Sequence, residues 1–167
     1  MVGDADFERL FDDQFGRCDH LARRLVHDDA VAEELAAEAF ARAWARWPKL
    51  RKQSPEGWVL RVTANLAIDA SRRLRLTPTP PPDPPPVSAA DAATLHVALV
   101  TALGALPRRQ REAIVLRYLA DLSEADVATA LGVSAGSVKT HVHRGLERLR
   151  GTLGPNHDPE VDLALDA

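Results

Sequence analysis

The sequence predicts an all-α protein made of two small helical domains joined by a Pro-rich linker. Alanine and leucine are abundant, and the β-branched and aromatic runs that are typical of strands are missing. Apolar residues instead recur at helical spacing on both sides of a proline-rich run at residues 77–86. Proline lacks a backbone donor and has a fixed φ, so we expect this run to form an extended polyproline II tether.

The first domain, residues 1–75, is predicted to be a three-helix bundle. The apolar positions of its first helix are Phe7, Leu10, Phe11, Phe15, Cys18, Leu21, Leu25 and Val26. A second helix is expected at about residues 30–47, ended by Pro48. Its apolar positions are Val31, Leu35, Phe40, Ala43, Trp44 and Trp47.

A third helix should follow a basic loop at residues 49–53. Ser54, Pro55 and Glu56 have the order of an N-cap, a first-position proline and a first-turn acid, which indicates a helix start. We expect this helix to reach about residue 73. The apolar residues that it should bury are Trp58, Val62 and Leu66, with Val59 and Ala70 as further candidates.

Two helices open the second domain, which is expected to cover residues 90–153, after a linker at residues 76–89. The first of them, at about residues 90–103, ends at Gly104. Pro107 opens the next helix, because proline is tolerated at the first helical position. This helix should extend to about residue 119, and its core candidates are Ile114, Val115, Leu116 and Leu119.

The last two helices are predicted with a short turn between them. Residues 123–126 (SEAD) resemble a capping box and should start a helix at residues 124–131. Gly132 ends it, and Ser134 caps a last helix at about residues 135–150. This pattern is typical of a helix-turn-helix, whose second helix enters the DNA major groove; the alternative is a hairpin used only for packing. The polar face of the last helix carries Ser137, Lys139, Thr140, His141, His143, Arg144 and Arg148.

Charge is segregated along the chain, although the formal net charge is only −3. Residues 1–41 are strongly acidic, whereas residues 42–75 are strongly basic. A second basic cluster lies near the C-terminus, and the tail at residues 154–167 is acidic and expected to be disordered. A phosphate backbone responds to the local field, so the two basic blocks favour binding to nucleic acid.

Several classes of protein are excluded by what the sequence lacks. Cys18 is the only cysteine, which excludes an internal disulfide and a multi-Cys zinc site, and we expect it to be buried. We see no signal peptide and no apolar stretch of the roughly 20 residues that span a bilayer, so we expect a cytoplasmic protein. Catalytic sets, Gly-rich phosphate loops and metal-ligand spacings are also missing. We therefore expect no enzyme, no metal and no cofactor.

Three segments, in this order, resemble the extracytoplasmic-function (ECF) group of bacterial RNA polymerase sigma factors. They are residues 32–44 (AEELAAEAFARAW), residues 58–73 (WVLRVTANLAIDASRR), and residues 105–118 (ALPRRQREAIVLRY) followed by residues 122–128 (LSEADVA). The resemblance implies a sigma region 2 domain at residues 1–75 and a region 4 domain at residues 90–153. It also implies the partners: core RNA polymerase through its β′ clamp and β flap, promoter DNA, and an anti-sigma factor.

The resemblance implies three sets of site residues. The polymerase-binding set lies at a spacing of four residues and consists of Glu34, Glu38 and Arg42. The set for the −10 promoter element consists of Lys49, Arg51, Lys52, Asn65, Asp69, Arg72 and Arg73. The set for the −35 element consists of Ser134, Ser137, Lys139, Thr140, His141, Arg144 and Arg148.

Further details follow from the same resemblance. The loop at residues 49–54 corresponds to the segment that receives a flipped −10 base, and we assign the neighbouring Trp58 to the core. Ala37 replaces a glutamine that the family usually carries, which removes one polar contact to the clamp. Two other interpretations of the residues stay open. One is a conventional regulator that binds duplex DNA as a dimer, and the other is a sigma-like decoy that binds polymerase without starting transcription.

Overall fold

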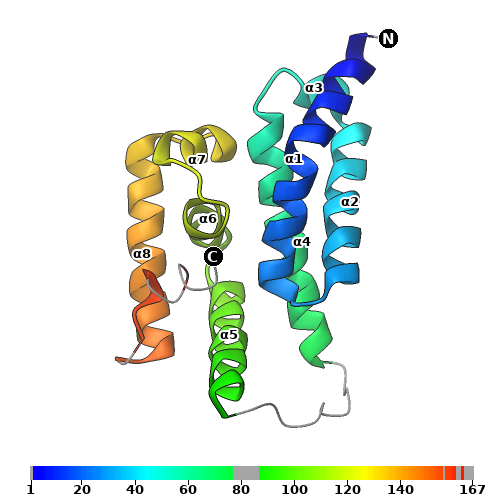
Figure 1. Cartoon of the computed structure of the whole chain (residues 1–167). Coiled ribbons are helices and arrows are strands. Elements are labelled where there is room, and N and C mark those ends of the chain that lie inside the picture. The colour runs from blue at the N-terminus through cyan, green and yellow to red at the C-terminus, as the bar shows by residue number, and fades with distance from the viewer. Residues whose placement is uncertain (1, 77–86, 156, 161–162, 164–167) are drawn as a thin grey trace.

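The computed structural model of the chain describes residues 2–76, 87–155, 157–160 and 163. These residues form helices and connecting turns without a β-strand (Figure 1), which confirms the all-α prediction. The helices are α1 (Val2–Val26), α2 (Asp29–Ala45), α3 (Trp47–Leu50), α4 (Pro55–Leu76), α5 (Val87–Ala105), α6 (Arg108–Ile114), the π-helical turn η1 (Val115–Leu119), α7 (Glu124–Leu131) and α8 (Ala135–Leu153). The tether expected at residues 77–86 lies outside the described residues.

The first half of the chain folds into a bundle of α1, α2 and α4 (Figure 1). Asp28 caps α2, because its Oδ1 accepts a hydrogen bond from the Val31 N–H at 3.0 Å. Pro48 lies in the first turn of the short helix α3, where its missing N–H has no helical partner to lose. The loop expected at residues 49–53 is therefore shorter than predicted, since its first two residues belong to α3.

The buried face of α4 differs from the predicted one. Trp58, Val62 and Leu66, which were expected in the core, stay partly exposed. The prediction placed one apolar stripe against one bundle, but α4 contacts α1 and α2 and also α5, α6, η1 and α7. Because it is covered from two sides, its buried apolar residues form a broader set: Val59, Leu60, Ala64, Ala67 and Ile68.

The helix predicted to end near residue 119 is divided in the structure. α6 ends at Ile114, and the chain continues as η1, in which the Ala120 N–H donates to the Val115 carbonyl at 2.9 Å. Such wide turns appear as local irregularities inside helices and leave the apolar periodicity almost unchanged. All four predicted core residues of this segment are buried, as expected: Ile114, Val115, Leu116 and Leu119.

The ends of α7 and α8 are set by local hydrogen bonds. Ser123 Oγ accepts a hydrogen bond from the Asp126 N–H at 3.1 Å, and Ser134 Oγ accepts one from the Ser137 N–H at 3.1 Å. Both predicted caps are therefore confirmed. Gly132 ends α7 with a φ of 64°, a left-handed conformation that glycine adopts without steric cost.

The two halves of the chain pack against each other along α4. Figure 1 shows α5 to α8 beside the bundle of α1, α2 and α4. Buried side chains from both halves form one continuous hydrophobic core. The sequence left the relative placement of the halves open, and the structure shows them docked.

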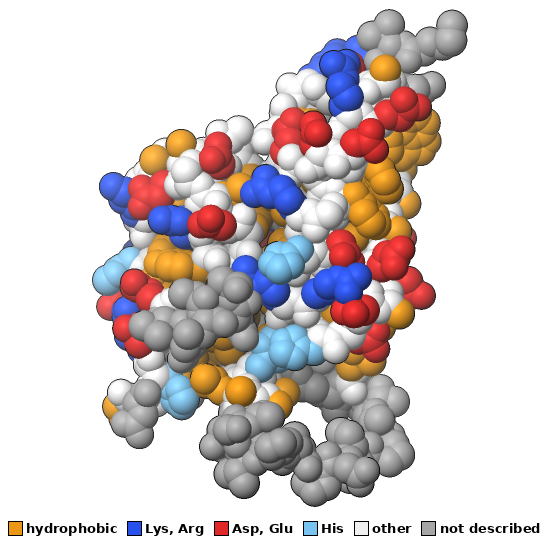
Figure 2. Space-filling model, in the orientation of Figure 1, with side chains coloured by type: hydrophobic (Ala, Val, Ile, Leu, Met, Phe, Trp, Pro, Cys, Tyr) orange, Lys and Arg blue, Asp and Glu red, His pale blue; other side chains and the backbone are white. Residues whose placement is uncertain are grey.

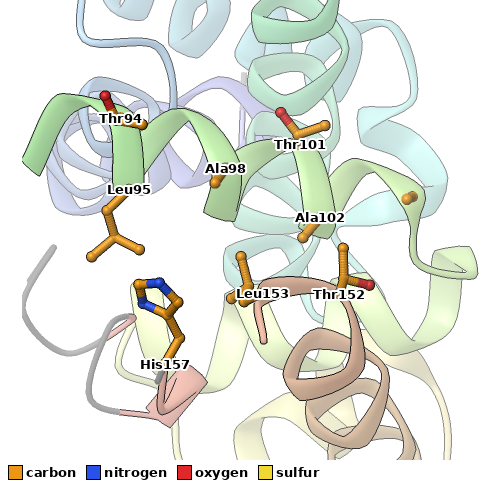
Figure 3. Close-up of a pocket in the computed structure, with 9 residues that line it drawn as sticks. Thr94, Leu95, Ala98, Thr101, Ala102, Thr152, Leu153 and His157 are labelled. Carbon is orange, nitrogen blue, oxygen red and sulfur yellow. The ribbon is translucent and has the colours of Figure 1, made fainter. Parts of the chain in front are cut away.

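The chain turns back toward the first half after α8. His157 faces Leu95 of α5 across a cavity of about 590 Å³ (Figure 3). Leu163 is 0% exposed, and its carbonyl oxygen accepts a hydrogen bond from Arg24 Nη2 at 3.2 Å. Leu163 is therefore packed in the core, although the sequence led us to expect a disordered tail from residue 154 onward.

Candidate nucleic-acid and polymerase interfaces

The polar face of α8 is exposed to solvent. Its buried side consists of Val138, Gly145, Leu146 and Leu149, which orients the opposite face outward. Lys139 Nζ lies 3.7 Å from Glu124 Oε2 at the start of α7, so the two helices of the turn carry opposite charges side by side. The exposed members of the predicted −35 set are Ser134, Lys139, Thr140, Arg144 and Arg148, and Ser137 and His141 are partly exposed.

The position of α8 depends on a close approach to α6. A Cβ atom added at Gly145 would lie 2.4 Å from Ile114 Cδ1, which is closer than packed carbon atoms come. Glycine therefore allows the two helix axes to approach at this point. This contact was not predicted from the sequence, although an isolated glycine inside a helical pattern was the available signal.

The charged face of α2 is also exposed. Glu34, Glu38 and Arg42 lie on it together, and Arg42 Nε contacts Glu38 Oε1 at 2.8 Å. An exposed pair at this spacing adds only about 0.3–0.5 kcal/mol to stability. Both side chains can therefore exchange this ion pair for other contacts at little cost in free energy. Ala37 lies exposed on the same helix.

Aromatic rings cluster between α1 and α2. The Phe7 ring lies edge-on against Trp44, with 4.9 Å between centroids, and Phe11 stacks on Phe15 at 4.7 Å. Trp44 is 50% exposed and Phe11 is 40% exposed, so these two apolar positions lie at the rim of the core. Figure 2 shows hydrophobic side chains along the outer side of the first half, next to acidic ones. This rim borders the charged face of α2.

A cavity of about 410 Å³ opens beside the basic loop after α3. Arg46, Lys49, Gln53 and Trp58 contribute to its walls. The Arg46 guanidinium lies over the Trp58 ring, 5.9 Å from the ring centroid, which is within cation–π range. Trp58 was assigned to the core from the sequence, but the structure places it partly exposed on this cavity wall. The exposed basic residues of the adjoining segment are Lys49, Arg51 and Lys52.

The structure separates the predicted −10 residues of α4 into two groups. Asp69, Arg72 and Arg73 are exposed near the end of the helix. Asn65 is instead covered by α6: its Nδ2 donates to Glu112 Oε1 at 2.9 Å, and its Oδ1 accepts from Arg111 Nη2 at 3.1 Å. The amide is therefore occupied on both sides by the second half of the chain.

Glu112 organises this contact with a side chain that is only 1% exposed. Its Oε1 also accepts a hydrogen bond from Arg108 Nε at 2.9 Å, and its Oε2 accepts one from Arg109 Nη1 at 3.3 Å. A buried carboxylate is unfavourable unless it is paired and hydrogen-bonded in this way. The cluster was not predicted from the sequence, because no local pattern connects Glu112 with a residue 47 positions away.

Arg61 reaches from α4 to the end of α7. Its Nη1 donates to the Ala130 carbonyl at 3.4 Å, while its Nε is buried without a hydrogen-bond partner. Burial lowers the pKa of the Arg61 guanidinium, and the nearby Glu112 carboxylate opposes that shift. The cation is held in place by the packing of the two halves.

Cys18 is fully buried, as expected, and burial raises the pKa of its thiol to about 11. Among the residues that the structure describes, no three His, Cys, Asp or Glu side chains are grouped as a metal site would require. In the same part of the chain, no helix has the length and hydrophobicity needed to cross a membrane.

Two family models match the chain. Sigma-70 region 2 matches residues 16–77, and Sigma-70, region 4 matches residues 96–149. The RNA polymerase sigma-E factor of Streptomyces coelicolor is 36% identical over 79% of this chain and 77% of that protein. The ECF RNA polymerase sigma factor SigW of Bacillus subtilis is 29% identical over 90% of this chain and 91% of that protein. The chain belongs to the ECF group of RNA polymerase sigma factors.

Solved structures show the same fold. The structure of CnrH in complex with the cytosolic domain of CnrY aligns with a TM-score of 0.56 at 22% identity, over 90% of this chain and 88% of that one. The sigma factor RpoE in complex with the anti-sigma factor NepR from Bartonella quintana aligns with a TM-score of 0.51 at 21% identity, over 89% of this chain and 96% of that one.

Proposed function

We propose that this sigma factor binds core RNA polymerase and starts transcription through three surfaces, one each for polymerase, the −10 element and the −35 element. Residues 1–75 form the region 2 domain and residues 90–153 form the region 4 domain. The β′ clamp binds the exposed α2 face that carries Glu34, Glu38 and Arg42, and the β flap binds the region 4 domain. The observation that carries the proposal is the cavity at Trp58, which opens beside a basic loop in the region 2 domain.

The cavity has the chemistry needed to hold a flipped −10 base. Trp58 provides an aromatic surface, and base–aromatic stacking contributes about 1–3 kcal/mol per base. Gln53 supplies polar groups for the edge of a base, and Lys49 lies where it can contact the phosphate that follows. The exposed side chains of Asp69, Arg72 and Arg73 extend the same function along α4.

The exposed face of α8 reads the −35 element in the major groove. Thr140 lies near the N-terminal end of this capped helix and Arg144 lies one turn further on, so both can reach base edges. Lys139 and Arg148 are placed for phosphate contacts, which position the helix and make binding salt-dependent.

An anti-sigma factor is a further proposed partner. Support comes from the similar solved structures, one of which is described as a complex with an anti-sigma factor. The exposed aromatic rim of Phe11 and Trp44 offers such a partner an apolar contact next to the α2 charges. We place the activity in the cytoplasm and, with polymerase on the chromosome, at the nucleoid.

Transcription from a pool of promoter fragments, with cognate core polymerase and with or without this protein, tests the proposal. Transcripts with defined start sites should depend on the protein. Lys139→Ala and Arg144→Ala should reduce output while leaving polymerase binding intact. Arg9→Ala, at an exposed α1 residue outside the three surfaces, is the matched control. Polymerase binding without transcripts would indicate a decoy, and the absence of both would indicate a regulator that acts without polymerase.

A further inference from the structure

Two arginines at the start of α6, Arg108 and Arg109, carry charges that none of the three proposed surfaces uses. Their side chains are 71% and 49% exposed. Neither residue belongs to the −35 set, which lies on α8 and at its cap. Exposed arginines are common on protein surfaces and most are simply solvated. A binding role requires in addition that the side chains are held in place and that they keep free donors.

Glu112 holds both guanidinium groups. Its Oε1 accepts a hydrogen bond from Arg108 Nε at 2.9 Å, and its Oε2 accepts one from Arg109 Nη1 at 3.3 Å. The carboxylate is only 1% exposed, so its position is fixed by the core and not by solvent. Each exposed arginine is therefore anchored at one nitrogen. Anchoring reduces the entropy that a long side chain loses when it binds a ligand.

Both arginines keep hydrogen-bond donors for a further partner. Arg108 uses only its Nε, and Arg109 uses only its Nη1, which also donates to the Leu131 carbonyl at 3.3 Å. Within the described part of the chain, the Nη1 and Nη2 groups of Arg108 and the Nε and Nη2 groups of Arg109 have no partner. Two adjacent N–H donors of one guanidinium can bind two oxygens of a single phosphate.

The charges around this pair favour an anionic ligand. Arg61 extends from α4 into the same region. Burial lowers the pKa of its guanidinium, the Glu112 carboxylate opposes that shift, and the nearby Arg109 and Arg108 cations lower the pKa further. These three guanidinium groups thus repel one another around one carboxylate. An added anion would relieve the repulsion, whereas an added cation would increase it.

The pair lies beside the turn of the helix-turn-helix. Leu131, whose carbonyl binds Arg109, is the last residue of α7, and Ser134, which caps α8, follows three residues later. Three residues span at most about 11 Å. Phosphates of one DNA strand follow one another at about 3.4 Å along the helix axis, so this span corresponds to about three base pairs. A duplex that receives α8 in its major groove can therefore place a backbone phosphate against these arginines.

We propose that Arg108 and Arg109 form an additional binding site for a backbone phosphate of promoter DNA, next to the −35 surface and oriented by Glu112. The site rests on the function proposed above for α8. Its ligand is a phosphate and not a base, so the site adds affinity and fixes the position of the helix without reading sequence. Loss of the site should therefore weaken binding to all duplexes equally.

Binding of the full chain to two labelled duplexes, between about 50 and about 200 mM salt, tests the site. One duplex has a random sequence, and the other is a promoter fragment recovered from the transcription pool. Arg108→Gln and Arg109→Gln each keep a donor for Glu112 but remove the charge. The slope of log affinity against log salt should become shallower by about 0.9 in each variant and by about 1.8 in the double variant, on both duplexes. The matched control is Arg9→Gln, at an exposed arginine of α1, which should leave the slope unchanged.

The lysine variants Arg108→Lys and Arg109→Lys separate charge from packing. They keep the cation, so they should keep the wild-type slope. A slope that is lost in the lysine variants as well would assign the effect to packing and overturn the site. Unchanged slopes in the glutamine variants, or a loss confined to the promoter fragment, would overturn it too.

Two further outcomes separate this site from the function on which it rests. Weaker binding by Lys139→Ala, together with unchanged slopes in the arginine variants, would leave the proposed −35 function standing and remove only the site. Failure of the wild type to bind either duplex would instead remove that function and the site together. Loss of polymerase binding in the arginine variants, with unchanged slopes, would assign these residues to polymerase and overturn the phosphate site.

Discussion

Asn65 on α4 and Glu112 on α6 share a hydrogen bond of 2.9 Å, although they lie 47 positions apart in the chain. The carboxylate is almost completely buried and also binds Arg108 and Arg109. The resemblance to sigma factors implies that Asn65 contacts promoter DNA. In this structure, Asn65 instead belongs to the contact between the two domains. The amide nitrogen also donates to the Arg61 carbonyl at 3.1 Å, so in this structure it already has two acceptors.

Glu112→Ala should lower the free energy of unfolding by about 1–2 kcal/mol. The substitution removes an acceptor of the partly buried Asn65 amide and leaves a gap where the buried side chain was, whereas Arg108 and Arg109 are exposed and can be hydrated instead. Urea denaturation followed by circular dichroism measures the change. The control is Glu147→Ala on the exposed face of α8, which should change stability by less than about 0.5 kcal/mol. Equal values for both variants would show that the buried cluster contributes nothing.

Gly145→Ala and Gly151→Ala should change the stability of the protein in opposite directions. Both glycines lie in α8, where alanine is favoured over glycine by up to about 1 kcal/mol. At Gly151 the added Cβ has no atom within 4 Å, so we expect a higher melting temperature. At Gly145 the added Cβ would lie 2.4 Å from Ile114 Cδ1. Overpacking costs about 1–3 kcal/mol, which should outweigh the gain in helix propensity and lower the melting temperature.

Calorimetry of a further pair of variants checks the cause of that difference. Ile114→Val removes the methyl group that the new Cβ would meet. The double variant Gly145→Ala, Ile114→Val should therefore be more stable than the sum of the single changes predicts. Simple additivity would indicate that the two groups do not collide.

Ser134→Ala should destabilise the protein by about 1 kcal/mol, because the Ser137 N–H loses its acceptor at the start of α8. Ser134→Asp keeps the cap and should retain nearly all of the stability. Its carboxylate should nevertheless weaken −35 binding through repulsion from phosphates. Thermal unfolding and binding to a −35 duplex separate the two effects. An aspartate variant that binds DNA as well as the wild type would place this residue outside the DNA interface.

Cys18 should make the stability of the protein fall as the pH rises from about 9 toward 11. Burial raises the pKa of its thiol from the ordinary value of 9.0 to about 11 in the folded protein, although a hydrogen bond with Thr63 opposes the shift. The raised pKa stabilises the fold fully below pH 9, and that contribution is lost as the pH approaches 11, by at most about 1.4 kcal/mol per pH unit.

Urea denaturation of the wild type and Cys18→Ala at pH 8 and pH 10.5 measures this contribution. Tyr118, whose pKa burial also raises, is present in both proteins, so its effect cancels in the comparison. The wild type should lose more stability than the variant across this range. Identical losses would mean that the thiol ionises equally well in the folded and unfolded chains.

The sequence predicted the local features of the fold well, above all the helix caps and the turn between the last two helices. The caps at Ser123 and Ser134 and the turn at Gly132 depend on neighbours within four residues, so their signals are contained in short segments. The polar face of α8 could be predicted for the same reason, since one helix determines which of its side chains point together.

Features that depend on distant parts of the chain were not predicted. The two-sided burial of α4 and the covered state of Asn65 both require the second domain, whose position no helical periodicity encodes. Trp58 was misplaced because an aromatic residue at helical spacing fits a core and a cavity wall equally well. Leu163 was missed because its acidic surroundings are typical of disordered tails.

The burial of Cys18 also determines how oxidative signals can act on this protein. The chain has no second cysteine with which to form an intramolecular bridge, and its only thiol is shielded from solvent and kept protonated at neutral pH. Peroxides and disulfides react with exposed thiolates, so this side chain is a poor target for them. If thiol oxidation controls promoter choice, another polypeptide must therefore sense the oxidant and transmit the signal through its contacts with this protein.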